Sequence, residues 1–555
     1  MSCIKIYLWL TYAGRSFRDI SNYDTLYPSF LDKRLEKEYI QMIAKIYSAT
    51  LQGLDALPVT IEINVTSSSV SRFSIVGLPD NAIRESQERV MTALSANDYK
   101  VIMKQIVVNL APADTKKEGS GFDLPMAIGI LLSMGDINND AIDRYMFVGE
   151  LSLDGTIQPI KGALPIAIKA REMGYEGLLI PAENAREAAV VNKLKVYSVH
   201  HLQEVVGFLN GTVELSPTEV NTREEFYAQQ SSFDFDFEEV KGQENVKRAF
   251  EVAAAGGHNI ILVGSPGCGK SMMAKRLPSI LPPLSLAESL ETTQIHSVAG
   301  KISKDTSLIS QRPFRAPHHT ISDVALVGGG TTFMPGEICL SHNGVLFLDE
   351  LPEFSKSVLE TLRQPLEDRI ITISRAKYNI TMPCSFMLEA SMNPCPCGYH
   401  HHPTHGCTCT PAQIQRYMNK ISGPLMDRID IQVEVEAVPF EDMSKAPKGE
   451  SSAVIRERVI KARMIQEKRF QGHKSIHCNA QMTSSLLHKY AVLDAESTER
   501  LRNAMKMFNL SARAYDRILK VARTIADLAG SETIKPMHIG EAIGYRNLDR
   551  ESWLD

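Results

Sequence analysis

The chain has 555 residues, which is too long for one ordinary hydrophobic core and predicts two to four domains. A composition of 44% hydrophobic and 23% charged residues excludes a disordered or fibrous protein. The net charge of −5 excludes a global basic field, so any contact with nucleic acid must come from a local basic surface.

The segment 1–41 precedes the first well-patterned part of the chain. Ile4–Ala13 is largely apolar, which is a feature of secretory signal peptides. We interpret the segment instead as an extension outside the fold, ahead of an internal start at Met42. Because no run of 18 or more apolar residues occurs, we expect no membrane-spanning helix and no membrane partner.

Residues 42–215 alternate short apolar strands with helical segments, which predicts an α+β domain. We expect strands at Val59–Val65, Phe73–Val76 and Val107–Leu110, and helices at Asn81–Ala96, Phe122–Met134 and Ile166–Met173.

Three further segments follow. Residues 216–236 are polar and acidic, which predicts an interdomain linker. Strands and helices alternate again over residues 237–440, which predicts a second domain of α/β type. Residues 441–555 predict a helical domain, with helices at Ala453–Phe470, Ala495–Phe508 and Ala512–Leu528.

A glycine-rich loop follows the apolar run Ile260–Val263 and precedes a helical segment, Met272–Leu277. Its pattern, G-x-x-x-x-G-K-S between strand and helix, predicts a phosphate-binding loop. We expect Lys270 to reach the β- and γ-phosphates of ATP and Ser271 to bind Mg²⁺. The pattern also arises by chance, but the flanking strand and helix favour a site. The residues expected to bind the nucleotide are Gly264, Ser265, Pro266, Gly267, Cys268, Gly269, Lys270 and Ser271.

A second apolar strand, Val345–Leu348, ends in Asp349 and Glu350. An acid at the end of a buried strand suits a Mg²⁺ ligand beside the phosphate-binding loop, and we assign that role to Asp349. Glu350 can then act as the general base that activates water. The alternative is an acidic helix cap after a core strand.

Several longer motifs carry a resemblance to a known family. They are Asp236–Ser271, Arg315–Thr320, Gly344–Glu350, Asn393–Gly398 and Ser422–Asp430. Together they resemble the magnesium-chelatase-like AAA+ proteins, in the order of the competence-associated ComM/YifB branch, from Met42 to about Asn547. The resemblance implies an α/β fold: a P-loop AAA+ core with a parallel sheet and flanking helices, an N-terminal Lon-protease-like α+β domain and a C-terminal helical lid.

The resemblance also implies further site residues. Asn393 matches sensor 1, which contacts the γ-phosphate or the attacking water. Arg428 matches the arginine finger, which acts on the ATP of a neighbouring subunit. Arg513 matches sensor 2, although Arg517 on the same helical face keeps that assignment open. A finger supplied to a neighbour requires a ring, and the proteins that this chain resembles form hexamers.

The front domain resembles the Lon protease fold at Lys117–Gly121 and Gly149–Gly162. Lon enzymes need a serine that is activated by a lysine. The serine position falls on Gly121, beside Ser120, and the lysine position falls on Leu164, three residues after Lys161. We therefore expect no active protease, and we expect this domain to serve assembly or partner binding.

Two C-x-C pairs, Cys395 with Cys397 and Cys407 with Cys409, predict a structural Zn²⁺ site in the loop 395–409. The loop is polar and has little apolar content to fold it, which favours a metal. Its histidines could replace a thiolate; they are His400, His401, His402 and His405. Free or buried thiols, and redox sensing, are the alternatives.

Two segments are candidates for a DNA interface. Arg369–Pro383 predicts a β-hairpin, in which Arg375 and Lys377 would contact phosphates and Tyr378 would stack on a base. The alternative for this segment is an exposed charged turn. Pro313–Gly330 holds Arg315, His318 and His319, which would contact DNA or a neighbouring subunit.

Taken together, these features predict a cytoplasmic, hexameric, ATP-driven DNA motor. By resemblance it would be a helicase that promotes branch migration during recombination of incoming DNA. Two alternatives stay open: a magnesium-chelatase-type motor that remodels a protein partner, and a nucleotide-gated scaffold with little turnover.

Overall fold

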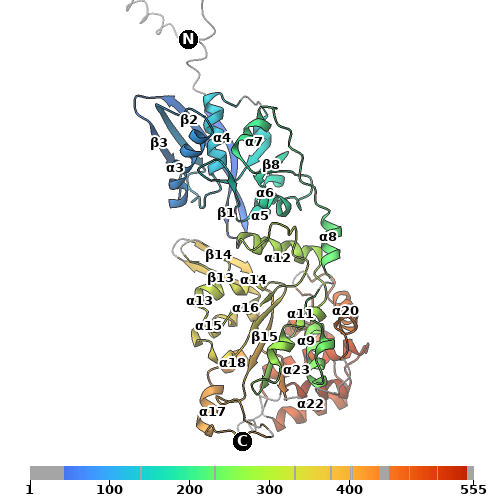
Figure 1. The fold of residues 1–555 in the computed structure, drawn as a ribbon. Coiled ribbons are helices and arrows are strands. Elements are labelled where there is room, and N and C mark those ends of the chain that lie inside the picture. Colours follow the sequence, from blue (N-terminus) through green and yellow to red (C-terminus); the bar gives the residue numbers. More distant parts are fainter. Residues whose placement is uncertain are drawn as a thin grey trace, which may run out of the picture.

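The computed structural model describes most of the chain, with gaps. The described residues are 43–137, 141–230, 233–330, 333–375, 378–400, 402, 404–436, 449–473, 476–508 and 510–546. They form an N-terminal body (residues 43–215), a core (residues 236–436) and a C-terminal helical body (residues 449–546), arranged along one long axis (Figure 1). The extension predicted at 1–41 lies outside the described residues, and the domain boundaries drawn at 215, 236 and 440 stay predictions.

The N-terminal body is built on one seven-stranded mixed sheet, in the order β3-β4-β2-β1-β5-β8-β9. The three predicted strands are present as β2, β3 and β4, and all three are longer than expected, β3 by one residue. The strands of this sheet are β1 (Ala44–Gln52), β2 (Asp55–Ser67), β3 (Arg72–Val76), β4 (Lys104–Ala111), β5 (Tyr145–Phe147), β8 (Gly177–Pro181) and β9 (Lys195–Val199).

The helices of this body cover the sheet (Figure 1). They are α3 (Asn81–Ala96), α4 (Asp123–Met134), α5 (Ala163–Glu172), α6 (Ala182–Ala188) and α7 (Leu202–Leu209). Helix α4 is buried from Asp123 to Leu131, so it is apolar on every side rather than on one stripe. Gly129 lets it approach the sheet closely, since a Cβ there would lie 2.4 Å from Ile63 Cδ1.

The polar segment 216–236 is not a uniformly irregular linker. It contains helix α8 (Thr222–Gln229), which buries Phe226. Glu225 pairs with Arg186 of the N-terminal body at 2.7 Å and accepts a hydrogen bond from Ser307 of the core, also at 2.7 Å. The polar composition concealed this helix, because one buried aromatic residue and the polar contacts of Glu225 and Gln229 hold it in place.

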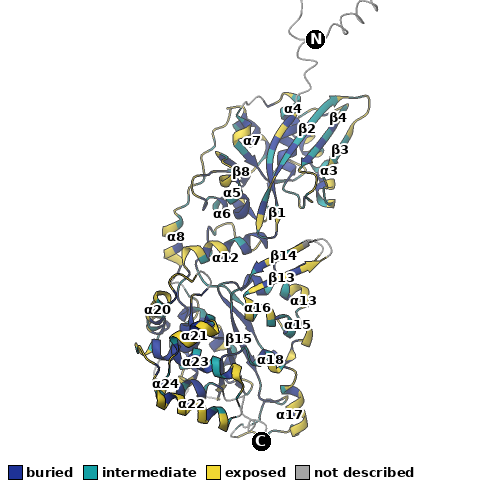
Figure 2. Cartoon of the chain, turned by 180° about the vertical axis from the view of Figure 1, so that it is seen from behind, coloured by how far each residue is buried: buried dark blue, intermediate teal, exposed yellow. Residues whose placement is uncertain are grey.

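The core is a five-stranded parallel sheet in the order β11-β12-β15-β10-β16. Its central strands are wholly buried (Figure 2), as expected for a parallel sheet with helices on both faces. The strands are β10 (Ile260–Gly264), β11 (Phe314–Arg315), β12 (Val345–Leu348), β15 (Met387–Met392) and β16 (Ile431–Val435). The predicted parallel-sheet fold class is confirmed.

Short helices surround this sheet and position its loops. They are α9 (Glu244–Gly256), α10 (Lys270–Ala274), α11 (Leu277–Ile280), α12 (Leu286–Val298), α13 (Asp323–Val327), α14 (Glu337–Leu340), α15 (Lys356–Thr361), α16 (Arg363–Asp368), α17 (Pro411–Met418) and α18 (Gly423–Met426). Helix α12 contacts the N-terminal body through two hydrogen bonds. Ser297 O accepts from the Gly162 N–H at 3.0 Å, and the Gln294 amide donates to Leu54 O at 2.8 Å.

The predicted hairpin is present as antiparallel strands β13 (Ile370–Arg375) and β14 (Tyr378–Pro383). It extends from the core toward the lower edge of the N-terminal body (Figure 1). There Ile380 packs close to the turn between β1 and β2, since a Cβ on Gly53 would lie 3.0 Å from Ile380 Cγ2.

The C-terminal helical body packs against α9 of the core. Its longer helices are α20 (Ser452–Arg469), α21 (Ser484–Tyr490), α22 (Ala495–Met507), α23 (Ala512–Leu528) and α24 (Pro536–Gly544). The three helices predicted here agree with α20, α22 and α23 to within one residue at each end. None of the described helices combines the length and hydrophobicity that crossing a bilayer requires.

Candidate functional site

The phosphate-binding loop joins the end of β10 to the start of α10, as predicted. Gly267 and Gly269 both adopt positive φ, at 81° and 93°, which glycine allows at little cost. Lys270 is buried, and its ammonium group donates to the carbonyls of Gly264 at 2.7 Å and Ser265 at 2.9 Å. It also donates to Asn393 Oδ1 at 3.2 Å. Lys270 and the predicted sensor 1 residue, Asn393, are therefore in direct contact beside the phosphate-binding loop.

Asp349 follows β12 and faces Ser271 of the adjacent loop. The Ser271 hydroxyl donates to Asp349 Oδ2 at 2.7 Å, while Oδ1 accepts from the Ser391 hydroxyl and, at 3.1 Å, from the Glu350 N–H. Ser271 and Asp349 thus form an oxygen pair of the kind that Mg²⁺ prefers. Sequence reasoning missed Ser391, a polar residue on buried strand β15 whose only signal was its place two residues before Asn393.

Glu350 sits at a sharp turn with φ of 54°, the left-handed region that non-glycine residues seldom adopt. Its side chain is 55% exposed, and Oε2 lies 3.5 Å from Nδ1 of His319. The segment Pro313–Gly330 therefore touches the candidate general base. Backbone strain of this kind is commonly retained at functional sites.

The two predicted arginines lie at the other edge of the sheet. Ile431 of β16 pairs with Ile260 of β10, so Arg428 lies at the amino ends of the parallel strands, whereas the loop with Lys270 follows their carboxyl ends. A five-residue strand separates these edges by about 16 Å. Arg428 pairs with Glu367 and donates to Pro424 O at 2.6 Å.

Arg513 at the start of α23 joins this edge through Asp427, with a separation of 3.4 Å, and its side chain is 67% exposed. Arg517 instead donates to buried Asp430 at 2.9 Å. Burial raises the pKa of Asp430, but the charges of Arg517 and His258 hold it below its usual range. Of the two candidates for sensor 2, Arg513 is therefore the more exposed, and Arg517 is bound to a buried carboxylate. The chain does not bring Arg428 or Arg513 to its own Lys270.

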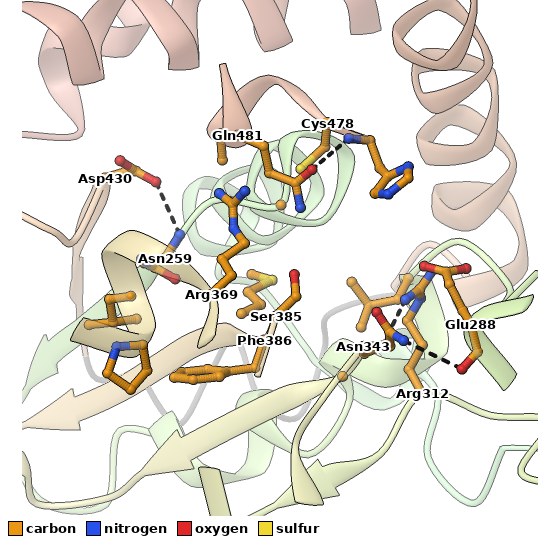
Figure 3. A pocket seen from close by; sticks show the side chains of 18 of the residues that line it. Asn259, Glu288, Arg312, Asn343, Arg369, Ser385, Phe386, Asp430, Cys478 and Gln481 are labelled. Carbon is orange, nitrogen blue, oxygen red and sulfur yellow. Dashed lines mark hydrogen bonds and ion pairs between the residues drawn. The ribbon is translucent and has the colours of Figure 1, made fainter. Parts of the chain in front are cut away.

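A basic pocket lies between the core and the C-terminal helical body, and residues of both line it (Figure 3). Its lining includes Arg312, Arg369, Arg463 and Arg517. Arg312 is neutralised by Glu288 at 3.2 Å, and it donates to two proline carbonyls and to Asn343 O. Burial lowers the pKa of the Arg369 guanidinium, and the nearby charge of Arg517 lowers it further. This edge of the core is therefore rich in arginine.

The four loop cysteines converge, as predicted. Their Sγ atoms all lie within 4.8 Å of one another. Cys395 Sγ is 3.3 Å from Cys397 Sγ and 3.7 Å from Cys407 Sγ, and Cys397 and Cys407 are 3.6 Å apart. Tetrahedral Zn–S bonds of about 2.3 Å place sulfur atoms about 3.8 Å apart, so the cluster fits a four-thiolate metal site.

The predicted DNA contacts are only partly described. Arg375 is exposed at the tip end of β13, while Lys377 and the side chain of Tyr378 lie outside the described residues. Arg315 is held by Glu337 in a two-bond ion pair at 2.6 and 2.8 Å, so it serves the core locally. His318 is exposed and packs on His319 with ring centroids 4.1 Å apart.

The Lon-like part of the chain places Ser120 and Lys161 around one cavity, together with Glu150 and residues of the core. The Ser120 hydroxyl donates to Glu150 Oε2. The Lys161 ammonium lies 3.7 Å from Met334 Sδ of the core. Each side chain has a partner other than the expected member of a serine–lysine pair.

Comparison with known families covers most of the chain. "Subunit ChlI of Mg-chelatase" matches residues 61–184, "Magnesium chelatase, subunit ChlI" matches 236–443, and "Magnesium chelatase, subunit ChlI C-terminal" matches 449–546. A Lon protease 2 of Bacillus subtilis is 26% identical over 172 residues, or 29% of this chain and 30% of that protein.

Two relatives match at nearly full length. "Competence protein ComM" of Haemophilus influenzae is 42% identical over 511 residues, which is 92% of this chain and 98% of the relative. "Uncharacterized protein YifB" of Salmonella typhimurium is 40% identical over the same length, again 92% of this chain and 98% of the relative. The predicted family is confirmed: the chain belongs to the magnesium-chelatase-like AAA+ ATPases of the ComM/YifB family.

Proposed function

We propose that the chain is one subunit of a hexameric, ATP-driven DNA motor of the cytoplasm. The observation that carries the proposal is the convergence of Lys270, Ser271, Asp349 and Asn393 at the carboxyl edge of one parallel sheet. These residue types at one edge are what phosphoryl transfer requires: a cation for the phosphates, oxygens for a metal, and an amide to orient the nucleophile.

The chemistry follows from the positions of these groups. Lys270 and the loop N–H groups bind the β- and γ-phosphates, and Ser271 and Asp349 hold Mg²⁺. When bound there, Mg²⁺ would supply charge neutralisation for the phosphates. Glu350, beside His319, accepts a proton from the attacking water, and Asn393 orients that water.

The site requires a neighbour. Arg428 and Arg513 lie about one strand length from their own Lys270, at the opposite edge of the sheet. We propose that a ring brings this arginine edge of one subunit against the nucleotide of the next, where both guanidinium groups neutralise transition-state charge. Arg369, close to Arg517, adds positive charge to the same edge.

DNA is the proposed substrate. Because the net charge is −5, DNA binding requires a local basic surface. We propose that the β13–β14 hairpin, with Arg375 and Lys377 in its sequence, provides this surface. A relative is named a competence protein, and competence concerns the uptake of DNA. We propose that the ring promotes branch migration during recombination of incoming DNA in natural transformation. The Lon-like body would serve assembly or partner binding without proteolysis.

A magnesium-chelatase-type motor that acts on a protein partner is the second candidate, because all three matching family models carry that name. A nucleotide-gated scaffold is a third. The test is ATP turnover without DNA, with single-stranded DNA and with forked DNA. The DNA motor predicts stimulation by DNA; a chelatase-type motor predicts none, and a scaffold predicts negligible turnover in every case.

The proposed metal of the four-cysteine cluster is a structural Zn²⁺. Thiolate ligands bind this ion well, and the sulfur spacing fits the tetrahedral geometry of a structural zinc site. Redox-active or free thiols are the alternative, and the metal content of the purified protein distinguishes the two.

A further inference from the structure

The cysteine loop is in contact with the nucleotide site. Residues 395–398 form a tight turn, in which the Gly398 N–H donates to Cys395 O at 3.0 Å. Gly398 faces Pro266 of the phosphate-binding loop: a Cβ built on it would lie 2.5 Å from Pro266 Cδ and 3.9 Å from Asn393 Cγ. Its φ of +85° also favours glycine. The turn therefore forms the outer wall of the phosphate-binding loop.

Only limited packing within the loop holds this turn in place: Tyr399 lies against His402 and His405, with ring centroids 5.6 and 5.1 Å apart. Cys395 is buried, but the rest of the loop is polar and mostly exposed or half-buried, and no described helix or strand lies between Asn393 and α17. A segment with so few apolar contacts needs another constraint to stay ordered. The four thiolates supply one, since a shared metal ion fixes Cys395 and Cys397 against Cys407 and Cys409.

The loop that contains this turn also connects Asn393 of the nucleotide site to helix α17. Asn393, two residues before Cys395, accepts from Lys270 at 3.2 Å. On the other side, Cys409 immediately precedes Thr410, which caps α17 through a capping box. A displacement of the turn would therefore move Pro266 and Asn393 together, on the two walls that face the phosphates.

We infer that a Zn²⁺ ion held by these four cysteines fixes the 395–398 turn against Pro266, and that this contact sets the affinity of the phosphate-binding loop for nucleotide. This inference rests on the proposed ATPase function. It makes the metal a positioning element for Pro266 and Asn393, without contact between the metal and the substrate. Loss of the metal would then weaken ATP binding in a subunit whose Lys270, Ser271 and Asp349 are unchanged.

A matched glycine pair tests the contact separately from the metal. Gly398→Ala adds a methyl group against Pro266, while Gly472→Ala, at a glycine with a similar positive φ of +94°, adds one where no atom lies within 4 Å. We expect both variants to keep about one Zn²⁺ per chain by plasma mass spectrometry. We expect only Gly398→Ala to weaken ADP binding, by about tenfold in titration calorimetry. Equal ADP affinity in the two variants would overturn the inference.

The double change Cys407→Ser with Cys409→Ser tests the metal itself. We expect loss of zinc and weaker ADP binding, whereas the control Cys478→Ser, a free cysteine outside the loop, keeps both. Wild-type protein purified under reducing conditions without bound zinc would contradict the proposal. Lys270→Ala distinguishes a failure of the proposed ATPase function from a failure of this inference. Unchanged ADP affinity in Lys270→Ala would refute the P-loop assignment. Weakened ADP binding in Lys270→Ala would support that assignment, and the glycine pair then tests the inference by itself.

Discussion

At the scale of single residues, Lys270 and Glu350 have two separate proposed roles: Lys270 in nucleotide binding and Glu350 in the activation of water. Lys270 lies inside the phosphate-binding loop, so Lys270→Ala should abolish nucleotide binding. The Glu350 side chain is exposed and its carboxylate lies beside His319, outside the phosphate-binding loop, so Glu350→Gln should keep ATP binding and slow turnover by about 10²–10⁴-fold. Calorimetry and steady-state ATPase assays measure the two effects. Normal turnover by Glu350→Gln would remove Glu350 as the base.

Glu389 is a residue whose burial makes a prediction about pH. It lies on central strand β15, wholly buried, and neither carboxyl oxygen has a hydrogen-bond partner among the described residues. Burial, and secondarily the charge of Asp349, raises the pKa of this carboxyl well above its ordinary value. The folded protein therefore holds Glu389 protonated at pH values where the unfolded chain ionises it.

The raised pKa of Glu389 makes the folded protein less stable as pH rises. A raised pKa means that the contribution of Glu389 to stability is fully present below the unfolded pKa, about 4.3, and declines as pH rises through the folded value. Glu389→Val should therefore stabilise the protein at pH 8 by about 1–3 kcal/mol, and by less at pH 5. Glu389→Gln, which keeps the size without the charge, should also remove the pH dependence. Thermal unfolding at the two pH values measures this, and destabilisation of Glu389→Val by equal amounts at both would contradict it.

At the scale of elements, the β13–β14 hairpin carries the prediction about DNA. Arg375→Ala with Lys377→Ala removes two positive charges from its tip, so DNA binding should weaken and the slope of log K against log salt should fall by about 2. Arg84→Ala with Lys100→Ala removes two exposed charges from the N-terminal body and serves as the control. Fluorescence anisotropy over a salt series measures the slopes. Equal slopes for both double variants would place the DNA site elsewhere.

The sequence predicted the elements whose signals are local. The G-x-x-x-x-G-K-S loop, strand Val345–Leu348 and helix Ala512–Leu528 all agree with the structure, because glycine spacing, apolar runs and helical periodicity are local properties. Helix α8 was missed, since its polar surface resembles a linker and a single residue, Phe226, is buried.

Contacts that depend on three-dimensional pairing could not be predicted. Ser391 reaches Asp349 only because β15 lies beside β12, and nothing in either segment specifies that partner. The packing of Gly398 on Pro266 likewise joins residues that are far apart in the sequence. The separation of Arg428 from Lys270 followed only from the parallel register of β10 and β16.

At the scale of the whole molecule, the two edges of the core sheet carry different groups of predicted site residues. One edge holds Lys270, Ser271 and Asp349, the groups proposed to bind the triphosphate and its metal, and the other holds Arg428 and Arg513. A single chain cannot join them, since each edge is fixed by the same rigid strands. A closed ring joins edge to edge with one repeated interface, which is the heterologous contact that cyclic symmetry requires.

Complementation between two inactive variants measures this directly. Arg428→Ala should lose at least about 10³-fold in turnover while it still binds ATP, and Glu350→Gln should also be inactive. In a 1:1 mixture, about a quarter of the interfaces would pair the intact nucleotide edge of an Arg428→Ala subunit with the intact Arg428 of a Glu350→Gln subunit. We predict ATPase activity in the mixture well above the mean of the two variants, at concentrations where sedimentation shows a ring. Activity no higher than that mean, with Arg428→Ala alone turning over like the wild type, would contradict the account.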